Sequence, residues 1–177
     1  MQTLKKFYFG KQKAKVNTFI GGIGGTINTP ALLASKLGIS ENRIKLFKVT
    51  GVDVECAIVG GTYSIPANAF KRNTTLTYYN DSDGLVTSVN EGAFVGATNA
   101  TYYIFPNLTT INSATAVGTG AFQNNTSLSS FVAPKLASIT GNYTFSTAGT
   151  TATNITSLNF PLLTGSLGAG TFVNQGK

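Results

Sequence analysis

The sequence repeats itself over most of its length. Five phenylalanines that each follow an alanine or a threonine recur at spacings of 24, 28, 23 and 27 residues: Phe70, Phe94, Phe122, Phe145 and Phe172. Six residues after the first three of them comes Leu76, Ala100 or Leu128, and the fourth unit reaches Ile155 after a four-residue insertion. A unit of this length has too few apolar residues to bury a core alone, so successive units are predicted to stack into one column.

A second pattern begins at each of these positions. Apolar residues follow three and five positions later, as at Tyr103 and Phe105, and a proline such as Pro106 comes next in the last three units. Residues two apart lie on one face of a strand, and proline cannot donate a hydrogen bond to a sheet. Each of these units is therefore predicted to hold one short strand that ends at the proline.

The segments 65–76 and 117–128 share the pattern Ile/Val-x-x-x-Ala-Phe-x-x-Asn-x-x-Leu. This pattern resembles the BspA-type branch of the leucine-rich-repeat proteins, which are found among bacterial surface proteins and phage virion proteins. The resemblance covers residues 62–172 and implies a mainly β fold, with a short leucine-rich-repeat-like solenoid at residues 62–177. The alternative is a β-sandwich of short strands, because turn residues recur about every 8–12 positions.

Residues 26–61 are predicted to form a small α+β region that anchors or caps the solenoid. Residues 29–38 favour a helix with an N-cap at Thr29 and a stop at Gly38. Its expected apolar face is formed by Leu32, Leu33 and Leu37. A hairpin is expected to follow over residues 44–59, with Cys56 facing inward as a small hydrophobic residue.

The charge is unevenly distributed. Residues 1–72 contain 11 of the 13 Lys and Arg residues and three acids, a net charge of +8, whereas residues 73–177 carry −1. Between Gly92 and Gly176 the only charged side chain is Lys135. Because charge normally keeps chains apart, this body favours a subunit of an assembly. We expect a homo-oligomer, for which a trimer is one arrangement.

Residues 1–25 are predicted to be a basic, aromatic arm followed by a flexible glycine joint at residues 21–25. Lysines beside aromatic rings can bind phosphate and stack on bases, so nucleic acid is one possible partner. Docking on an acidic protein surface is the favoured interpretation, and a solvated terminus is the third. The residues predicted to anchor the chain are Lys5, Lys6, Phe7, Tyr8, Phe9, Lys11, Lys13 and Lys15.

The residues that most enzymes and metal sites need are scarce. The chain has no His and one Cys, which excludes His-dependent acid–base catalysis, intramolecular disulfides and Cys-cluster metal sites. Asp53 and Glu55 are expected on one strand face, and Asp81 and Asp83 in a loop before Gly84. A carboxylate pair could serve glycoside hydrolysis, and Asp81-x-Asp83-Gly84 weakly resembles a calcium loop that lacks its other ligands, but a solvated polar loop is the favoured interpretation. We therefore expect no enzyme activity, no cofactor and no metal. No apolar run suits a cleaved leader or a membrane span, so no membrane partner is expected.

The resemblance also implies a binding face, formed by strand residues that lie between the core positions. It is uncharged and mixes aromatic, aliphatic and hydroxyl groups, which suits a sugar, a neutral protein surface or a neighbouring subunit better than nucleic acid. The concave-face contacts expected to matter most are Tyr78, Tyr102, Ile104 and Val132.

These features together favour a structural protein of a bacteriophage virion, located in the particle as a head fibre, capsid decoration or tail-attached fibre. Its expected partners are other virion proteins of the capsid or tail, held through the basic N-terminal region, with a host-surface glycan as a further ligand. The alternative that the resemblance implies is a bacterial surface adhesin or glycan-binding repeat module.

Overall fold

The computed structural model describes residues 17–116, 118–147 and 155–173 of the chain. Within these ranges it contains short strands, one α-helix and one 3-10 helix. The elements are β1 (Thr18–Gly21), α1 (Pro30–Leu37), η1 (Glu41–Arg43), β2 (Ile44–Thr50), β3 (Asp53–Ile58), β4 (Tyr63–Ile65), β5 (Tyr78–Asp81), β6 (Val86–Val89), β7 (Tyr102–Ile104), β8 (Thr110–Asn112), β9 (Ser130–Val132), β10 (Ser138–Thr140) and β11 (Ser157–Asn159).

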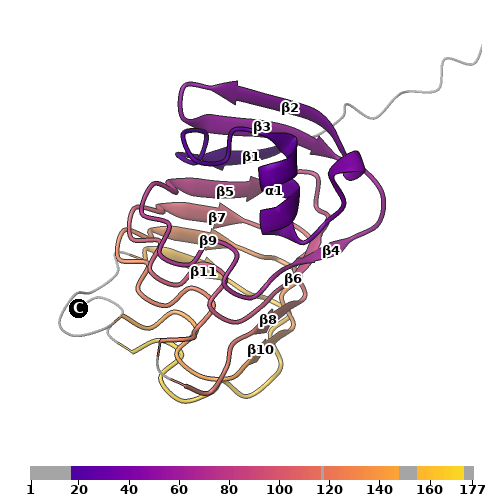
Figure 1. Ribbon diagram of the computed structural model, residues 1–177. Helices are drawn as coiled ribbons and strands as arrows, with labels where there is room; N and C mark the ends of the chain where they lie inside the picture. The colour runs from indigo at the N-terminus through magenta and orange to yellow at the C-terminus, as the bar shows by residue number, and fades with distance from the viewer. Residues whose placement is uncertain (1–16, 117, 148–154, 174–177) are drawn as a thin grey trace, which may run out of the picture.

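The repeats wind into a solenoid with two sheets (Figure 1). A seven-stranded sheet has the order β11-β9-β7-β5-β1-β3-β2, and a four-stranded sheet has the order β10-β8-β6-β4. Within the repeats each strand pairs in parallel with the strand one coil later, as β5 does with β7 and β7 with β9. Parallel stacking of successive coils is the arrangement of a solenoid, so the predicted fold class is confirmed and the sandwich alternative does not hold.

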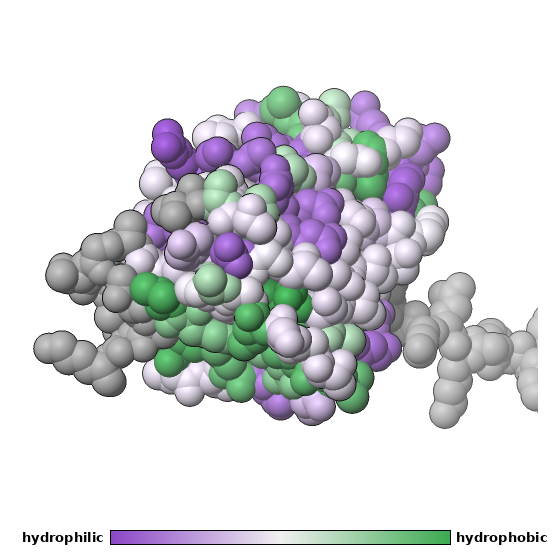
Figure 2. Space-filling model, turned by 90° about the horizontal axis from the view of Figure 1, so that it is seen from below, coloured by the Kyte–Doolittle hydropathy of each residue, from purple (hydrophilic) through white to green (hydrophobic). Residues whose placement is uncertain are grey.

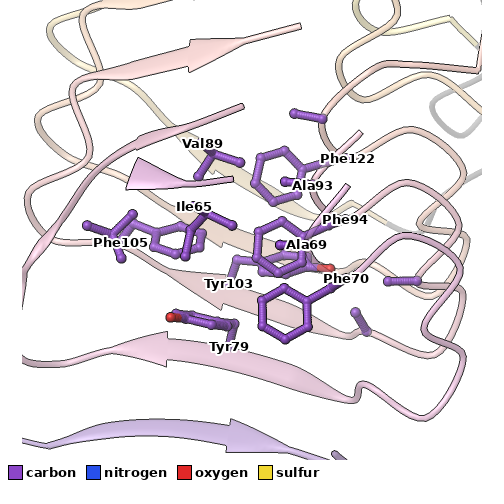
Figure 3. Close-up of a cluster of buried hydrophobic side chains, with 14 of the residues drawn as sticks. Ile65, Ala69, Phe70, Tyr79, Val89, Ala93, Phe94, Tyr103, Phe105 and Phe122 are labelled. Atoms are coloured by element: carbon purple, nitrogen blue, oxygen red, sulfur yellow. The ribbon is translucent and has the colours of Figure 1, made fainter. Parts of the chain in front are cut away.

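The core of the solenoid is a stack of phenylalanine rings, one from each coil (Figure 3). Neighbouring rings are inclined by no more than 10° to one another. Tyr79, Tyr103 and Phe131 enter from the seven-stranded sheet and are fully buried. The predicted column of side chains spaced about one coil apart is therefore confirmed. The stacked pairs and their centroid distances are Phe70–Phe94 at 5.2 Å, Phe94–Phe122 at 5.1 Å, Phe122–Phe145 at 5.4 Å and Phe145–Phe172 at 5.4 Å.

The four-stranded sheet supplies the opposite wall of the core. Ile65, Val89, Ile111 and Ile139 are buried there and follow one another in register from strand to strand. The sequence pattern contained these apolar positions but did not predict that they form a second sheet. The pairing of these strands could not be predicted from the sequence, because loops of variable length make the spacing from each of these residues to the next phenylalanine inconstant.

The helix and the hairpin of the N-terminal region form as predicted. Thr29 caps α1 by accepting a hydrogen bond from the Leu32 amide, and Gly38 ends the helix in the left-handed conformation. The predicted apolar face needs one correction, because Leu32 is 46% exposed. Ala34 faces the core together with Leu33 and Leu37. Leu33 and Leu37 are four residues apart and share one face of the helix, whereas Leu32 lies about 100° around the helix from Leu33 and outside that face.

The predicted flexible glycine joint is wrong. Residues 18–21 form β1, which lies between β3 and β5 and pairs with both in antiparallel fashion. Beyond β1, the Gly22 amide donates to Asp53, the Gly24 amide donates to the Val52 carbonyl at 2.8 Å, and Ile23 is fully buried. The segment therefore belongs to the body. It joins the N-terminal hairpin to the first parallel strand of the solenoid.

Candidate functional site

The outer face of the seven-stranded sheet brings together the four residues that were predicted to make face contacts. Tyr78 pairs with Tyr102 across β5 and β7, and Ile104 pairs with Val132 across β7 and β9. All four side chains are partly or largely exposed, because the alternate residues of these strands point into the core. The predicted anchoring residues of the arm, at positions 5–15, lie outside the described residues.

The register of the sheet arranges the outer-face side chains in two rows. The first row runs Gly21, Tyr78, Tyr102, Ser130, Ser157 from β1 to β11, and the second runs Phe19, Asn80, Ile104, Val132, Asn159. From β7 to β11 neither row contains a charged side chain. A ligand lying across β7, β9 and β11 would meet aromatic, aliphatic, hydroxyl and amide groups only.

Two tyrosines form the most distinctive feature of this face. The Tyr78 and Tyr102 rings are parallel to within 6°, and their centroids lie 4.9 Å apart. Tyr78 leans over Gly21, where a Cβ atom would lie only 2.2 Å from its ring. A glycine at this point of β1 is therefore what allows the ring to lie against the sheet, and Tyr102 stacks on it.

Asp53, at the start of β3, places a negative charge near the tyrosine stack. Its Oδ1 accepts a hydrogen bond from the Gly22 amide at 3.0 Å. Partial burial first, and the negative charge of Asp53 second, raise the pKa of Tyr78 to about 12. The phenol therefore stays protonated at neutral pH.

Sequence reasoning missed Gly21 and Asp53 as parts of this site. Neither residue belongs to a repeat, and each comes close to Tyr78 only because β1 lies between β3 and β5. No local pattern in the sequence predicts a pairing between strands more than thirty residues apart. The repeat pattern predicted only that Tyr78 and Tyr102 share a face.

Next to Tyr102 the same row continues with small side chains. Ser130 and Ser157 take the positions on β9 and β11 where another tyrosine would continue the stack. The ring face of Tyr102 that points away from Tyr78 is therefore flanked by hydroxyl groups, while Ile104 and Val132 of the second row line the adjacent surface. A flat ring with apolar faces and a polar rim fits this arrangement chemically.

Cys56 and Asp81, the thiol and one of the acids singled out in the sequence, both lie in the interior. Cys56 is fully buried, and burial together with Asp83, Asp81 and Glu55 raises the pKa of its thiol to about 12. Asp81 is buried as well, and the Thr18 hydroxyl shares its one hydrogen between carboxylate oxygens of Asp81 and Asp83, each 3.4 Å away. Among the described residues, no group of three or more Cys, Asp and Glu side chains could hold a metal ion. The interpretation of Asp81 as a solvated group is therefore wrong.

A pocket opens at the N-terminal end of the solenoid, between α1 and residues 71–75. Its volume is about 420 Å³, and its lining includes the cations Lys36, Lys71 and Arg72 beside the hydroxyl groups of Ser35 and several threonines. No acidic residue contributes to the lining. The pocket is therefore a positively charged concavity at the N-terminal end of the solenoid.

Comparison with known proteins gives a family. A family model described as a BspA type Leucine rich repeat region, in 6 copies, matches residues 54–177. The match covers well over half of the chain and confirms the resemblance drawn from residues 65–76 and 117–128. Neither a curated protein nor a solved structure matches. In the described parts of the chain, none of the helices has the length and apolar character needed to cross a bilayer.

Proposed function

We propose, from the premise that the chain belongs to the BspA-type leucine-rich-repeat family, that it is a surface recognition module of adhesion type whose ligand is a neutral carbohydrate. The ligand would lie on the outer face of the seven-stranded sheet, against Tyr102. The observation that carries this proposal is the parallel Tyr78–Tyr102 stack, which presents a fixed aromatic ring beside uncharged hydroxyl groups.

The physical basis is the shape and polarity of a sugar ring. One face of a pyranose carries C–H groups that are slightly positive, and the face of an aromatic ring is slightly negative, so the two attract as they pack. The hydroxyl groups at the rim of the sugar need hydrogen-bond partners, which Ser130, Ser157 and Asn159 are placed to provide. The absence of charged side chains on β7, β9 and β11 disfavours an ionic ligand.

Glycan-array screening followed by calorimetric titration tests the proposal. Tyr102→Ala is expected to abolish binding of a neutral glycan that the unaltered chain retains, whereas Tyr102→Phe is expected to preserve most of it because the ring remains. Thr140→Ala, at an exposed position on β10 in the other sheet, is the control. Retention of only sulfated or acidic glycans, or equal binding by Tyr102→Ala, would contradict the proposal.

A second candidate function is that of a structural protein of a bacteriophage virion, as a head fibre, capsid decoration or tail-attached fibre. The positively charged pocket lined by Lys36, Lys71 and Arg72 favours it, because a cationic concavity at one end suits attachment to an acidic surface of a capsid or tail protein. The sheet face, which would then project from the particle, remains available for a host-surface glycan.

Immunogold labelling of purified particles tests the virion candidate. The chain is expected on the particle surface, and the double variant Lys71→Glu/Arg72→Glu is expected to dissociate from particles at lower salt. Lys135→Glu changes a lysine of the solenoid outside the pocket and serves as the control. Particles that lack the chain altogether would exclude this candidate.

A further inference from the structure

The two ends of the solenoid differ in how their core is covered. One end, which we name the closed end, is covered by α1 and by the antiparallel strands β1, β3 and β2 (Figure 1). The other, which we name the open end, is formed by residues 155–173. Figure 2 looks onto the open end and shows apolar side chains gathered in a continuous band there.

The burial of equivalent residues falls sharply at the open end. Leu158 on β11 takes the same register position as Phe131 on β9, yet Leu158 is 37% exposed and Phe131 is fully buried. Phe172 covers Phe145 in the ring stack, but its own outer side is only partly covered. Leu162, Leu167 and Val173 are exposed as well. The rest of the column is buried from solvent. An exposed apolar surface at its end is typical of a site of contact with another protein.

The open end also has a free sheet edge. In the described part of the chain β11 is the last strand of the seven-stranded sheet, whereas the last coil lies over the other sheet, where the Thr164 amide donates to the Ala137 carbonyl beside β10. The outward backbone N–H and C=O groups of β11 can pair with a further strand. A partner that fits must therefore offer a strand edge together with an apolar surface.

Charge selects among the partners that meet this description. Residues 155–173 contain no charged side chain, whereas the closed end carries Lys36, Arg43, Lys45, Lys48, Lys71 and Arg72. Two copies of the closed end would repel each other, and the closed end covers its own core. A head-to-tail contact would press the cationic surface of the closed end against the apolar surface of the open end, and burying unpaired charges against apolar groups is unfavourable. Two open ends can meet without repulsion, and each covers the apolar surface of the other.

We infer that the open end binds a second copy of this chain, tail to tail, about a two-fold axis. Such a contact is isologous and closed, so it produces a dimer and no filament. The two-fold axis sets β11 antiparallel to the same strand of the second copy and joins the two apolar columns. The dimer points both closed ends outward and leaves the outer sheet faces of both copies exposed.

Analytical ultracentrifugation of the full chain over a range of concentrations tests this inference. The unaltered chain is expected to be a dimer, and the double variant Leu158→Lys/Leu162→Lys is expected to be a monomer or to dimerise at least about tenfold more weakly. Val52→Lys is the matched control, because Val52 is 59% exposed on the hairpin of the closed end. The control is expected to remain a dimer.

A spin-label experiment determines which ends of the two copies meet. It does not depend on the lysine variant, so a failure of that variant to fold would not affect it. Labels at Thr164→Cys on the open end are expected to lie much closer together across the dimer than labels at Val52→Cys. A chain that stays monomeric at every concentration overturns the inference. So does a dimer that the lysine variant leaves intact, or one in which the labels at position 52 are the closer pair.

Discussion

At the scale of single residues, Asn125 joins two coils through one buried amide. Its Nδ2 donates to the Phe94 carbonyl at 2.8 Å and to the Phe122 carbonyl at 2.9 Å, and its Oδ1 accepts from the Tyr103 hydroxyl at 2.5 Å. The side chain is fully buried. Water cannot replace these bonds, so the residue is required for the backbone to turn at this corner of the coil.

We expect Asn125→Ala to lower the free energy of unfolding by about 2–3 kcal/mol, since it leaves two buried carbonyls and a phenol without this partner. Urea unfolding followed by circular dichroism measures the change. Asn99→Ala is the control: the Asn99 amide also donates to the carbonyl of a neighbouring coil, that of Thr74, but the residue is exposed and water can substitute. Equal losses in the two variants would contradict the argument.

Asp81 gives the fold a pH dependence. The residue occupies an inward strand position that is apolar in the coil of Tyr103 and Phe105, and it accepts hydrogen bonds from the Val86 amide at 2.9 Å and the Leu85 amide at 3.3 Å. Burial outweighs these bonds and raises its pKa from 3.8 to about 6. The folded chain therefore holds a proton that the unfolded chain has already released between these two values.

Because the folded-state pKa is the higher one, this group contributes stability below pH 4 that is lost as the pH rises toward 6 and beyond. The loss is about 1–3 kcal/mol. Urea unfolding at several pH values is expected to show the decline in the unaltered chain and a flatter profile in Asp81→Asn. An identical slope in the variant would show that Asp81 is not the source of the decline.

At the scale of elements, each coil is held to the next by its phenylalanine. We expect Phe94→Ala to cost about 3–5 kcal/mol, because Phe94 is fully buried and stacks on Phe70 and Phe122. The same change at Phe172 is the control and is expected to cost clearly less at dilute concentration, because among the described residues Phe172 has one ring neighbour, Phe145. Thermal unfolding measures the loss of stability in each of the two variants, and equal losses would contradict the argument.

The strand β1 couples the N-terminal hairpin to the tyrosine stack. We expect Gly21→Ala to displace Tyr78, since the added Cβ would lie 2.2 Å from its ring and 2.4 Å from the Thr77 hydroxyl oxygen. Near-ultraviolet circular dichroism is expected to lose part of its tyrosine signal, and glycan affinity is expected to fall severalfold. Gly25→Ala meets no atom within 4 Å and should leave both unchanged.

At the scale of the whole molecule, charge is separated along the solenoid axis. Among the described residues every cation except Lys135 lies at the closed end, whereas the strands β7, β9 and β11 present no charged outer side chain. Glycan affinity at the sheet face is therefore expected to change little between low and high salt, since salt screens interactions between charges. Calorimetric titration with the glycan at two ionic strengths measures this salt dependence. A steep fall in affinity with salt would indicate an ionic ligand.

Much of the fold could be predicted because the repeat is a periodic signal. The spacing of Phe70, Phe94 and Phe122 requires stacked coils, and the capping residues Thr29 and Gly38 fix the ends of α1 by local chemistry. The site was predicted in part for the same reason. Tyr78 and Tyr102 occupy equivalent positions of successive coils, so a repeat that stacks must align them.

The coil, the ring column and the uncharged face follow from residue patterns alone, since each of these depends on residues one repeat apart. The entry of β1 into the sheet between β3 and β5, the approach of Gly21 to Tyr78 and the exposed apolar side chains at the open end became visible in the folded chain alone. These features join or expose segments that have no shared period. They form because an open sheet edge and an apolar surface need covering, and local residue patterns do not specify which distant segment covers them.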